Sequence, residues 1–198
     1  WQLELIPFYF KVNNVKNFIQ NISYLEDKTI LNGIVKLGYF SGLLFSFIKL
    51  NQIFRDGFDS KLYSYKRFER FEDWADSIWK NSKTKYTLLA DRSAKYLNAI
   101  YPDNDKTLIN LKIIFKKKII GWCVLKKTRV SNHKQFGNMF LGSIVDCLCL
   151  DGYEKIIISC ANDYLMKNNV DLIVTNQSSK SFCASLQKNG FIKGPSNF

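Results

Sequence analysis

The fold is decided by residues 107–125, TLINLKIIFKKKIIGWCVL, where two apolar, β-branched runs flank three lysines. Two such runs around a short polar turn are typical of a β-hairpin. The apolar run Phe140–Leu148 predicts a third strand, and Asp171–Thr175 predicts a fourth. Residues Tyr153–Lys167 and Ser179–Lys188 predict the helices that follow these two strands. The sequence therefore predicts an α+β or α/β fold, a mixed sheet made of an antiparallel hairpin and a βαβα unit.

This order of elements, with Gly190-Phe191 directly after the last helix, resembles the GNAT superfamily of acyl-coenzyme A dependent N-acyltransferases. Several short sequence segments resemble one group within it, bacterial GNAT-type proteins of two-domain size, some of which are linked to surface-polysaccharide functions. These segments are Asp91–Asn98 with Tyr101-Pro102, Gly121-Trp122, His133-Lys134 with Phe136-Gly137, Gly142–Asp146, Asn176–Ser178 and Gly194–Phe198. The resemblance covers roughly residues 60–198.

The resemblance divides the chain into two parts. Residues 1–60 are expected to form an inter-domain connector segment with helices, and residues 61–198 a GNAT-like acyltransferase domain. It also implies that the chain is a C-terminal fragment. The parent chain would carry another GNAT-like domain before Trp1, and the sheet would lack the strands that follow Phe198.

Helices are expected at several places before the hairpin. Asn13-Asn14 predicts a short helix start, and aromatic residues at helical spacing from Phe68 to Trp79 predict one buried helix face. Tyr86–Ala90 reads as a short strand, after which Asp91 is expected to cap a helix. Within Ile34–Leu50, Lys36 and Lys49 bracket an uncharged run of twelve residues, too few to span a bilayer. A buried or inter-domain helix is expected there, and no transmembrane segment.

The net charge of +12 is unevenly spread. Nine lysines or arginines and no acid lie between Asp105 and Asp146. Such a field attracts anions, among them coenzyme A phosphates, anionic glycans, nucleic acid or an anionic membrane. Nucleic acid is not the expected partner, because lysines outnumber arginines and the aromatics keep core spacing. The five cysteines lie in apolar runs, which predicts free thiols, a cytoplasmic location and no metal site.

The resemblance implies that acetyl-CoA or another acyl-CoA is the co-substrate and that a small amine, such as an amino-sugar, accepts the acyl group. The thioester would lie between the strands Phe140–Leu148 and Asp171–Thr175. Residues along this gap and at the following helix start would hold the donor. They are Ser143, Ile144, Val145, Cys147, Gly152, Tyr153 and Asn176. The superfamily's Gln/Arg-x-x-Gly-x-Gly/Ala loop is absent here. Its place is taken by Cys149–Lys155, which carries two acids and keeps one glycine.

Three residues are candidates for catalysis. Asp146 lies within an apolar strand, where burial would raise its pKa and suit it to accept a proton. A strand-end cap or a buried acceptor is the alternative for this residue. His133, the only histidine, is expected in a loop and could accept a proton there. Histidines in exposed loops are more often without a role. Cys183 lies on the helix that carries a proton-donating tyrosine in many GNAT enzymes, although simple packing also explains it.

Three function classes follow. The first is an N-acyltransferase that uses acyl-CoA. The second is a FemAB-like aminoacyl transferase, whose donor is carried on tRNA. The third is a binding or scaffold module with a GNAT fold and no catalysis, since one fold hosts many functions.

Overall fold

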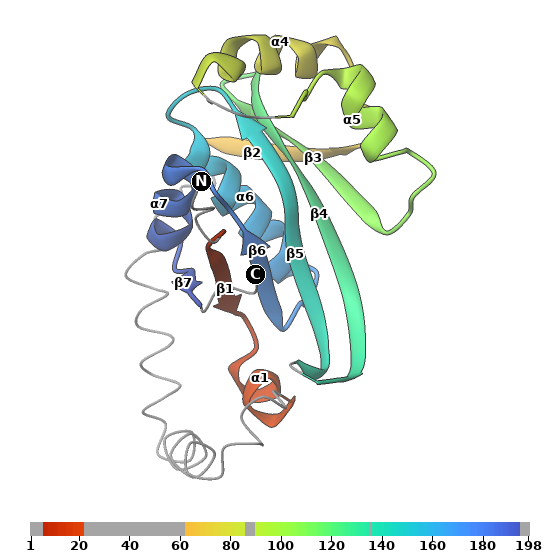
Figure 1. Ribbon diagram of the computed structural model, residues 1–198, viewed down its shortest axis with the longest axis vertical. Coiled ribbons are helices and arrows are strands. Elements are labelled where there is room, and N and C mark those ends of the chain that lie inside the picture. The colour runs from red at the N-terminus through yellow and green to blue at the C-terminus, as the bar shows by residue number, and fades with distance from the viewer. Residues whose placement is uncertain (1–5, 22–61, 86–89, 135, 195–198) are drawn as a thin grey trace, which may run out of the picture.

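The computed structural model describes residues 6–21, 62–85, 90–134 and 136–194 (Figure 1). These residues form one seven-stranded sheet in the order β2-β3-β4-β5-β6-β1-β7. The strands are β1 (Phe8–Val12), β2 (Tyr63–Phe68), β3 (Leu108–Phe115), β4 (Lys118–His133), β5 (Gly137–Cys149), β6 (Leu172–Asn176) and β7 (Ile192–Lys193). Neighbouring strands are antiparallel except β5 and β6. The predicted mixed sheet and its parallel pair are therefore confirmed.

Helices cover both faces of the sheet (Figure 1). They are α1 (Val15–Asn21), α4 (Asp73–Ser82) with the 3-10 turn η2 (Lys83–Lys85), α5 (Ala94–Ile100), α6 (Glu154–Lys167) and α7 (Lys180–Lys188). On one face, α6 and α7 bury a large apolar cluster that includes Ile157, Leu165 and Phe182. Helices α4 and α5 cover the upper part of the other face, and α1 lies at its lower end (Figure 1).

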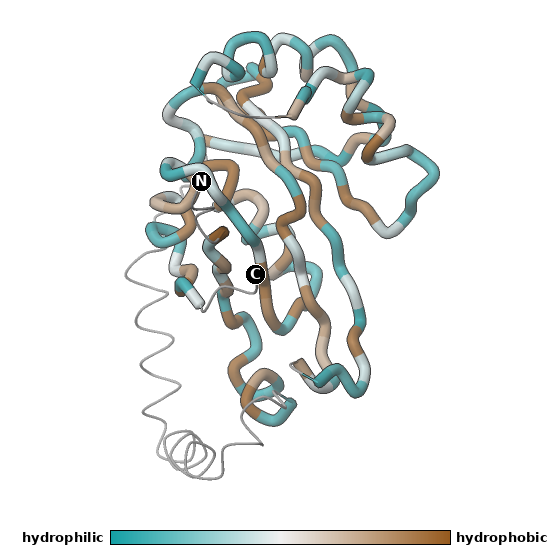
Figure 2. Tube along the Cα trace, viewed as in Figure 1, coloured by the Kyte–Doolittle hydropathy of each residue, from teal (hydrophilic) through white to brown (hydrophobic). Residues whose placement is uncertain are grey.

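Apolar residues are frequent along the central strands and alternate with polar residues along the helices, as the hydropathy colouring shows (Figure 2). Trp122 and Leu148 point to the α4 face, where Phe71 meets the Trp122 ring at 5.2 Å. Their chain neighbours Cys123 and Cys149 point to the α6 face. This alternation follows from the two-residue period of a strand. Residues Ile120–Leu125 of β4 and Leu148-Cys149 of β5 are thus buried on both sides of the sheet.

Strand β1 fills an interior position that the sequence analysis did not foresee. It pairs with β6 over all five of its residues, from Phe8 opposite Asn176 to Val12 opposite Leu172, and with β7 on its other side. Residues 8–12 had been assigned to the connector segment. In the structure they form a strand of the sheet between β6 and β7.

Other segments differ from expectation in detail. Strand β2 was not predicted, and it ends at Phe68, so the aromatic stripe begins on a strand and continues on α4 from Asp73. Ser93, not Asp91, is the N-cap residue of α5. The apolar segment Ile34–Leu50 and most of the expected strand at 86–90 lie outside the described residues. Within the described ranges, no helix is long and apolar enough to cross a membrane.

Candidate functional site

The site begins where the two parallel strands part. Their register runs from Leu141 opposite Leu172 to Ser143 opposite Val174, and no pairing follows although both strands continue. One hydrogen bond closes the fork, because the Thr175 hydroxyl donates to the Ile144 carbonyl at 2.9 Å. Beyond this bond the carboxyl ends of β5 and β6 diverge.

A β-bulge on β5 lies at the same level. Ile144 is opposite Leu125 and Asp146 is opposite Val124, so Val145 is an extra residue without a partner on β4. A bulge bends its strand and changes the direction of the side chains that follow. Val145 is 44% exposed and lines the opening between the strands. The bulge therefore turns β5 away from β6 and opens the sheet at this point.

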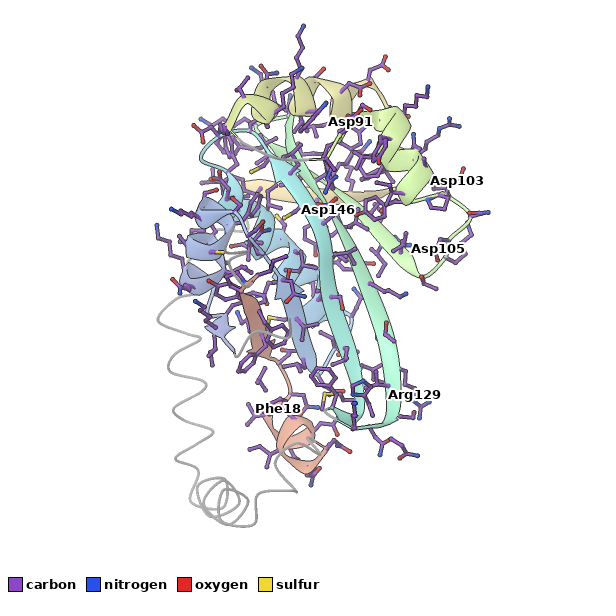
Figure 3. All side chains as sticks on the ribbon, viewed as in Figure 1. Phe18, Asp91, Asp103, Asp105, Arg129 and Asp146 are labelled. Atoms are coloured by element: carbon purple, nitrogen blue, oxygen red, sulfur yellow. The ribbon has the colours of Figure 1, made fainter. Side chains whose placement is uncertain are left out.

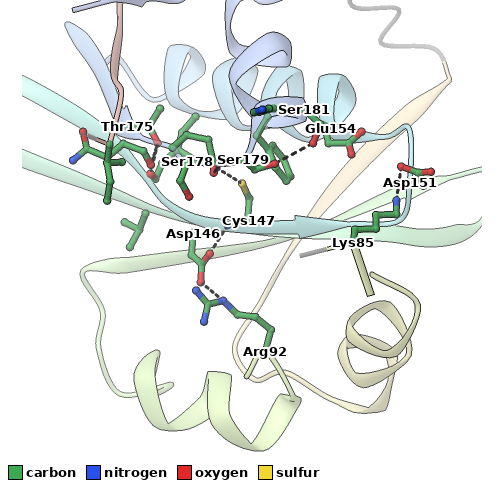
Figure 4. A pocket seen from close by; sticks show the side chains of 17 residues that line it. Lys85, Arg92, Asp146, Cys147, Asp151, Glu154, Thr175, Ser178, Ser179 and Ser181 are labelled. Atoms are coloured by element: carbon green, nitrogen blue, oxygen red, sulfur yellow. Dashed lines mark hydrogen bonds and ion pairs between the residues drawn. The ribbon is translucent and has the colours of Figure 1, made fainter. Parts of the chain in front are cut away.

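A pocket of about 760 Å³ occupies the opening (Figure 4). Its walls come from the ends of β5 and β6, the start of α7, the loop before α6, and the segments around η2 and α5. The lining residues are Ile6, Lys85, Arg92, Ile144–Cys147, Asp151, Glu154 and Thr175–Phe182. Ligands of open α/β sheets usually bind at such a divergence of parallel strands. The described residues therefore place a candidate site at the position expected for the donor.

Asp146 is held by three groups. Its carboxylate forms an ion pair with the Arg92 Nε at 2.9 Å, accepts a hydrogen bond from the Tyr101 hydroxyl at 3.0 Å, and accepts another from the Cys147 amide at 2.9 Å. The side chains of Asp146 and Arg92 are 15% and 18% exposed. Burial raises the pKa of Asp146, while Arg92 and Tyr101 act in the opposite direction. Burial prevails, so the carboxylate is less stable here than in water.

A second ion pair stands at the other end of the pocket, where Lys85 contacts Asp151 (Figure 4). The hydrogen bond and charge of Lys85 lower the pKa of Asp151. This contact compensates part of the acidic charge in the loop before α6. Lys180, at the start of α7, adds another positive charge to the lining. The cations of this pocket thus come from η2, from the segment before α5 and from α7, not from the β5–α6 loop.

The wall formed after β6 is polar and uncharged up to Lys180. Gln177 organises it, because its side-chain oxygen accepts a hydrogen bond from the Ser179 amide at 2.9 Å and its side-chain amide lies 3.9 Å from the Cys147 sulfur. The backbone N–H of Gln177 donates to the Pro7 carbonyl at 3.1 Å, which connects the wall to the segment before β1. The Ser179 and Ser181 hydroxyls are 3.1 Å apart. Such a wall offers many hydrogen bonds without a net charge.

The thiol of Cys147 is poorly suited to nucleophilic attack. Burial raises its pKa well above the usual value, and the neighbouring Asp146 raises it further. Since the thiolate is the reactive form, the protonated Cys147 is expected to be inert near neutral pH. All five cysteines are free thiols. Among the residues that the structure describes, no three Cys, His, Asp or Glu side chains gather as metal ligands.

Five of the ten residues proposed from the sequence line this pocket: Ile144, Val145, Asp146, Cys147 and Asn176. The other five do not. Ser143 is the last paired residue before the fork. Gly152 is in a left-handed turn with φ +79°, which favours glycine. Tyr153 is the N-cap residue of α6 and packs against Phe115. Cys183 donates from its sulfur to the Gln177 carbonyl at 3.2 Å, behind the pocket wall.

His133 lies in a different region. It is the last residue of β4 and pairs with Gly137 at the first residue of β5, and its ring stacks on Phe136. Asp146 lies nine positions after Gly137 on β5, which corresponds to about 30 Å of extended strand. Figure 3 shows Arg129, on the same hairpin, near the end opposite to Asp146. The structure therefore does not bring His133 and Asp146, or His133 and Cys183, into one site.

Several site residues were not proposed from the sequence. Arg92 and Tyr101 reach Asp146 from segments that precede β3, and Lys85 reaches Asp151 from η2. An acid within an apolar strand does signal that a partner is needed. Nothing in the spacing indicates which of the many basic residues supplies it, because these contacts depend on how α4 and α5 fold over the sheet.

Comparison with known proteins gives matches in structure only. No family model matches the chain, and no curated protein sequence matches it. The N-myristoyltransferase of Saccharomyces cerevisiae, solved with myristoyl-CoA, superimposes with a TM-score of 0.50 and 12% identity over 66% of this chain and 37% of the other. A GNAT family acetyltransferase of Staphylococcus aureus gives 0.48 and 16%, over 69% and 96%. A probable acetyltransferase gives 0.48 and 13%, over 67% and 91%.

At identities this low, the structural similarity shows the fold and not the activity. The β3–β4 hairpin, the parallel pair β5–β6 and the fork after Ser143 and Val174 agree with the expectation from the sequence, whereas β1 and β2 were not expected. This chain has a GNAT-like fold.

Proposed function

We propose that the chain is an N-acyltransferase that takes its acyl group from acyl-CoA and transfers it to a small amine. The observation that carries this proposal is the fork between β5 and β6, with the bulge at Val145 and a pocket of about 760 Å³ in the opening. The fold similarity to acyltransferases, including one solved with myristoyl-CoA, supports the same reading.

The pocket residues fit a thioester donor that carries phosphate groups. The slender arm of the donor would lie along the diverging ends of the strands, held at Val145 and Asn176. Lys85 and Lys180 would balance the phosphate charge that the acidic loop before α6 cannot. Bound acyl-CoA would supply the activated acyl group. Under this assignment the phosphate charge does not require a basic β5–α6 loop, because other segments of the same pocket supply cations.

Asp146 is the proposed proton acceptor. Its carboxylate lines the pocket, and burial raises its pKa, which makes the carboxylate a better proton acceptor. Arg92 and Tyr101 fix the carboxylate on one oxygen, Oδ2, and the Cys147 amide binds the other. The amine of the acceptor would lose its proton to Asp146, directly or through water. Arg92 and Tyr101 are positioning residues in this scheme.

Direct transfer from donor to amine is favoured over a covalent acyl-enzyme. The raised pKa keeps Cys147 protonated, and Cys183 has no histidine beside it, since His133 is on a distant hairpin end. The polar wall of Asn176, Gln177 and Ser178 supports an acceptor rich in hydroxyl groups, such as an amino-sugar. A polycationic acceptor is less suited, because two of the acids that line the pocket are already paired with Arg92 and Lys85.

The test combines binding and turnover. Calorimetry with coenzyme A and acetyl-CoA measures donor binding, and release of the free thiol in the presence of glucosamine and other small amines measures transfer. Asn176→Trp places a large ring at the exposed end of β6 and is expected to abolish donor binding. Ser131→Trp, on the exposed part of β4, is the matched control and should bind as the unchanged chain does. Equal binding by Asn176→Trp, or no binding by the unchanged chain, would contradict the proposal.

A further inference from the structure

The β3–β4 hairpin turn carries lysines where the backbone favours other residues. Phe115 is paired with Lys118, so the loop has two residues, Lys116 and Lys117. Both are left-handed, with φ of 45° and 66°. Two-residue hairpin turns of this kind strongly prefer Asn and Gly, because other side chains are strained at positive φ. The sequence thus keeps two lysines at positions where they destabilise the turn.

A second unfavourable arrangement lies beside the turn. Lys66 of the edge strand β2 is directly opposite Lys112 of β3. Like charges that face each other across antiparallel strands repel and destabilise the pair. Lys112 is half-buried and lies 5.8 Å from the centre of the Trp74 ring. Lys66, Lys116 and Lys117 therefore lie at the corner of the sheet where the turn meets β2, and Lys112 follows further along β3, against both turn preference and charge repulsion.

The same corner is hollow. A depression of about 520 Å³ is lined by Leu62, Tyr63, Ser64, Lys66, Ile114, Lys116 and Lys117, and none of these residues is acidic. It shares no residue with the pocket between β5 and β6. Features that break local preferences together are expected at functional sites, where a ligand offsets what the free protein loses. At this depression the ligand expected on these grounds carries negative charge.

We propose that this corner, defined by Lys66, Lys116 and Lys117, binds a ligand that carries two or more phosphate groups. Lysine ammonium groups act as compact point charges and are common phosphate-binding groups. The depression is large enough for several such groups. The phosphates can belong to a soluble polyphosphorylated molecule or to the headgroups of an anionic membrane. This inference does not depend on the proposed acyl transfer.

The test uses a variant that improves the turn while it removes the charges. Lys116→Asn with Lys117→Gly supplies the preferred residues and is expected to raise the Tm by roughly 2–5 °C. The same variant is expected to bind inorganic tripolyphosphate about tenfold more weakly, or worse, by calorimetry at low salt. A purely structural role for the lysines predicts no loss of binding. The control Lys80→Gln with Lys95→Gln removes the same charge from exposed helix positions and should bind normally.

Vesicles distinguish the two sources of phosphate. Retention by phosphatidylglycerol vesicles but not by phosphatidylcholine vesicles, with competition by tripolyphosphate, indicates lipid headgroups. Binding of tripolyphosphate without retention by either vesicle indicates a soluble ligand. The proposal is wrong if the turn variant binds tripolyphosphate as tightly as the unchanged chain, or if the control variant loses as much affinity. Coenzyme A binding should be unchanged in the turn variant, which separates this site from the pocket between β5 and β6.

Discussion

Replacing Arg92 with glutamine removes the cation that lies 2.9 Å from the Asp146 carboxylate and leaves the carboxylate largely buried. Two charges about 4 Å apart interact by roughly 4 kcal/mol at an effective dielectric constant of 20. Since both side chains are less than one-fifth exposed, solvent screening weakens this interaction only in part. We expect Arg92→Gln to lower the free energy of unfolding by about 2–4 kcal/mol at neutral pH. For a chain of this length the Tm should fall by roughly 5–15 °C.

The pH dependence follows from the direction of the pKa shift. The folded-state pKa of Asp146 is raised above 3.8, so protonation contributes stability that is present at low pH and is lost as pH rises through the folded pKa. Arg92 lowers that pKa, so its removal raises the pKa further. The stability deficit of Arg92→Gln should therefore be largest at neutral pH. It should shrink as pH falls through the folded pKa of Asp146.

A double-mutant cycle isolates the contact. Asp146→Asn removes the buried carboxylate but leaves the Arg92 guanidinium, only 18% exposed, without its partner, so this single change should also lower the free energy of unfolding. Adding Asp146→Asn to Arg92→Gln should restore most of what Arg92→Gln loses. Urea unfolding of the four proteins at pH 7 and pH 5 measures these terms. Additive effects, or a deficit that is independent of pH, would refute the reasoning. If Asp146 is also the proton acceptor, Asp146→Asn should reduce turnover per folded molecule by about 10²–10⁴.

Three further outcomes can be measured directly. Gly121→Ala would place a Cβ 2.6 Å from Ile157 and 2.7 Å from the Leu148 carbonyl, so urea unfolding should show a loss of about 1–3 kcal/mol; equal stability would contradict this packing. Cys147 should resist alkylation by iodoacetamide at pH 8 in the folded chain and react in urea, because burial keeps the thiol protonated; rapid labelling of the folded chain would refute this. Deleting residues 1–12 uncovers the edge of β6 and should abolish cooperative thermal unfolding; a sharp transition would show that β1 is dispensable.

The sequence predicted the segments whose pattern is local. Residues 107–125 contain both strands and the turn of a hairpin, and the observed strands β3 and β4 pair as expected. The run Phe140–Leu148 lies within β5, and the parallel partner was also identified. Burial on both faces makes such strands continuous apolar runs, which are easily recognised. The GNAT-like fold could be predicted because these central elements are also its most distinctive ones.

The edges of the sheet could not be predicted in the same way. Strand β2 (YSYKRF) alternates tyrosines that face α6 with exposed serine and lysine, so its apolar content is low. Strand β1 is short and contains Lys11, a residue that suggests a surface position. In the structure Lys11 is 2% exposed and donates a hydrogen bond to the Asn189 carbonyl. Only the tertiary fold places that acceptor within reach, across 178 positions of sequence.

The candidate site shows the same division between what is local and what is not. The side chains supplied by the two parallel strands were identified, because strand ends next to each other point to a shared opening. The groups that control their charge were not, since Arg92, Tyr101 and Lys85 come from segments that fold over the sheet only after its strands have paired.

Strand β1 joins this argument to the site itself. It lies against β6 along its whole length, and the Pro7 carbonyl just before it accepts a hydrogen bond from the Gln177 amide. Ile6, one residue earlier, lines the pocket. A segment that the sequence analysis placed in a connector thus supports the strand from which the polar wall of the pocket extends. The opening between β5 and β6 needs β6 to be held on its far side, because on its near side the pairing has already stopped. β1 supplies that hold, so the proposed acyl-transfer site depends on residues 6–12 as directly as on the fork after Ser143.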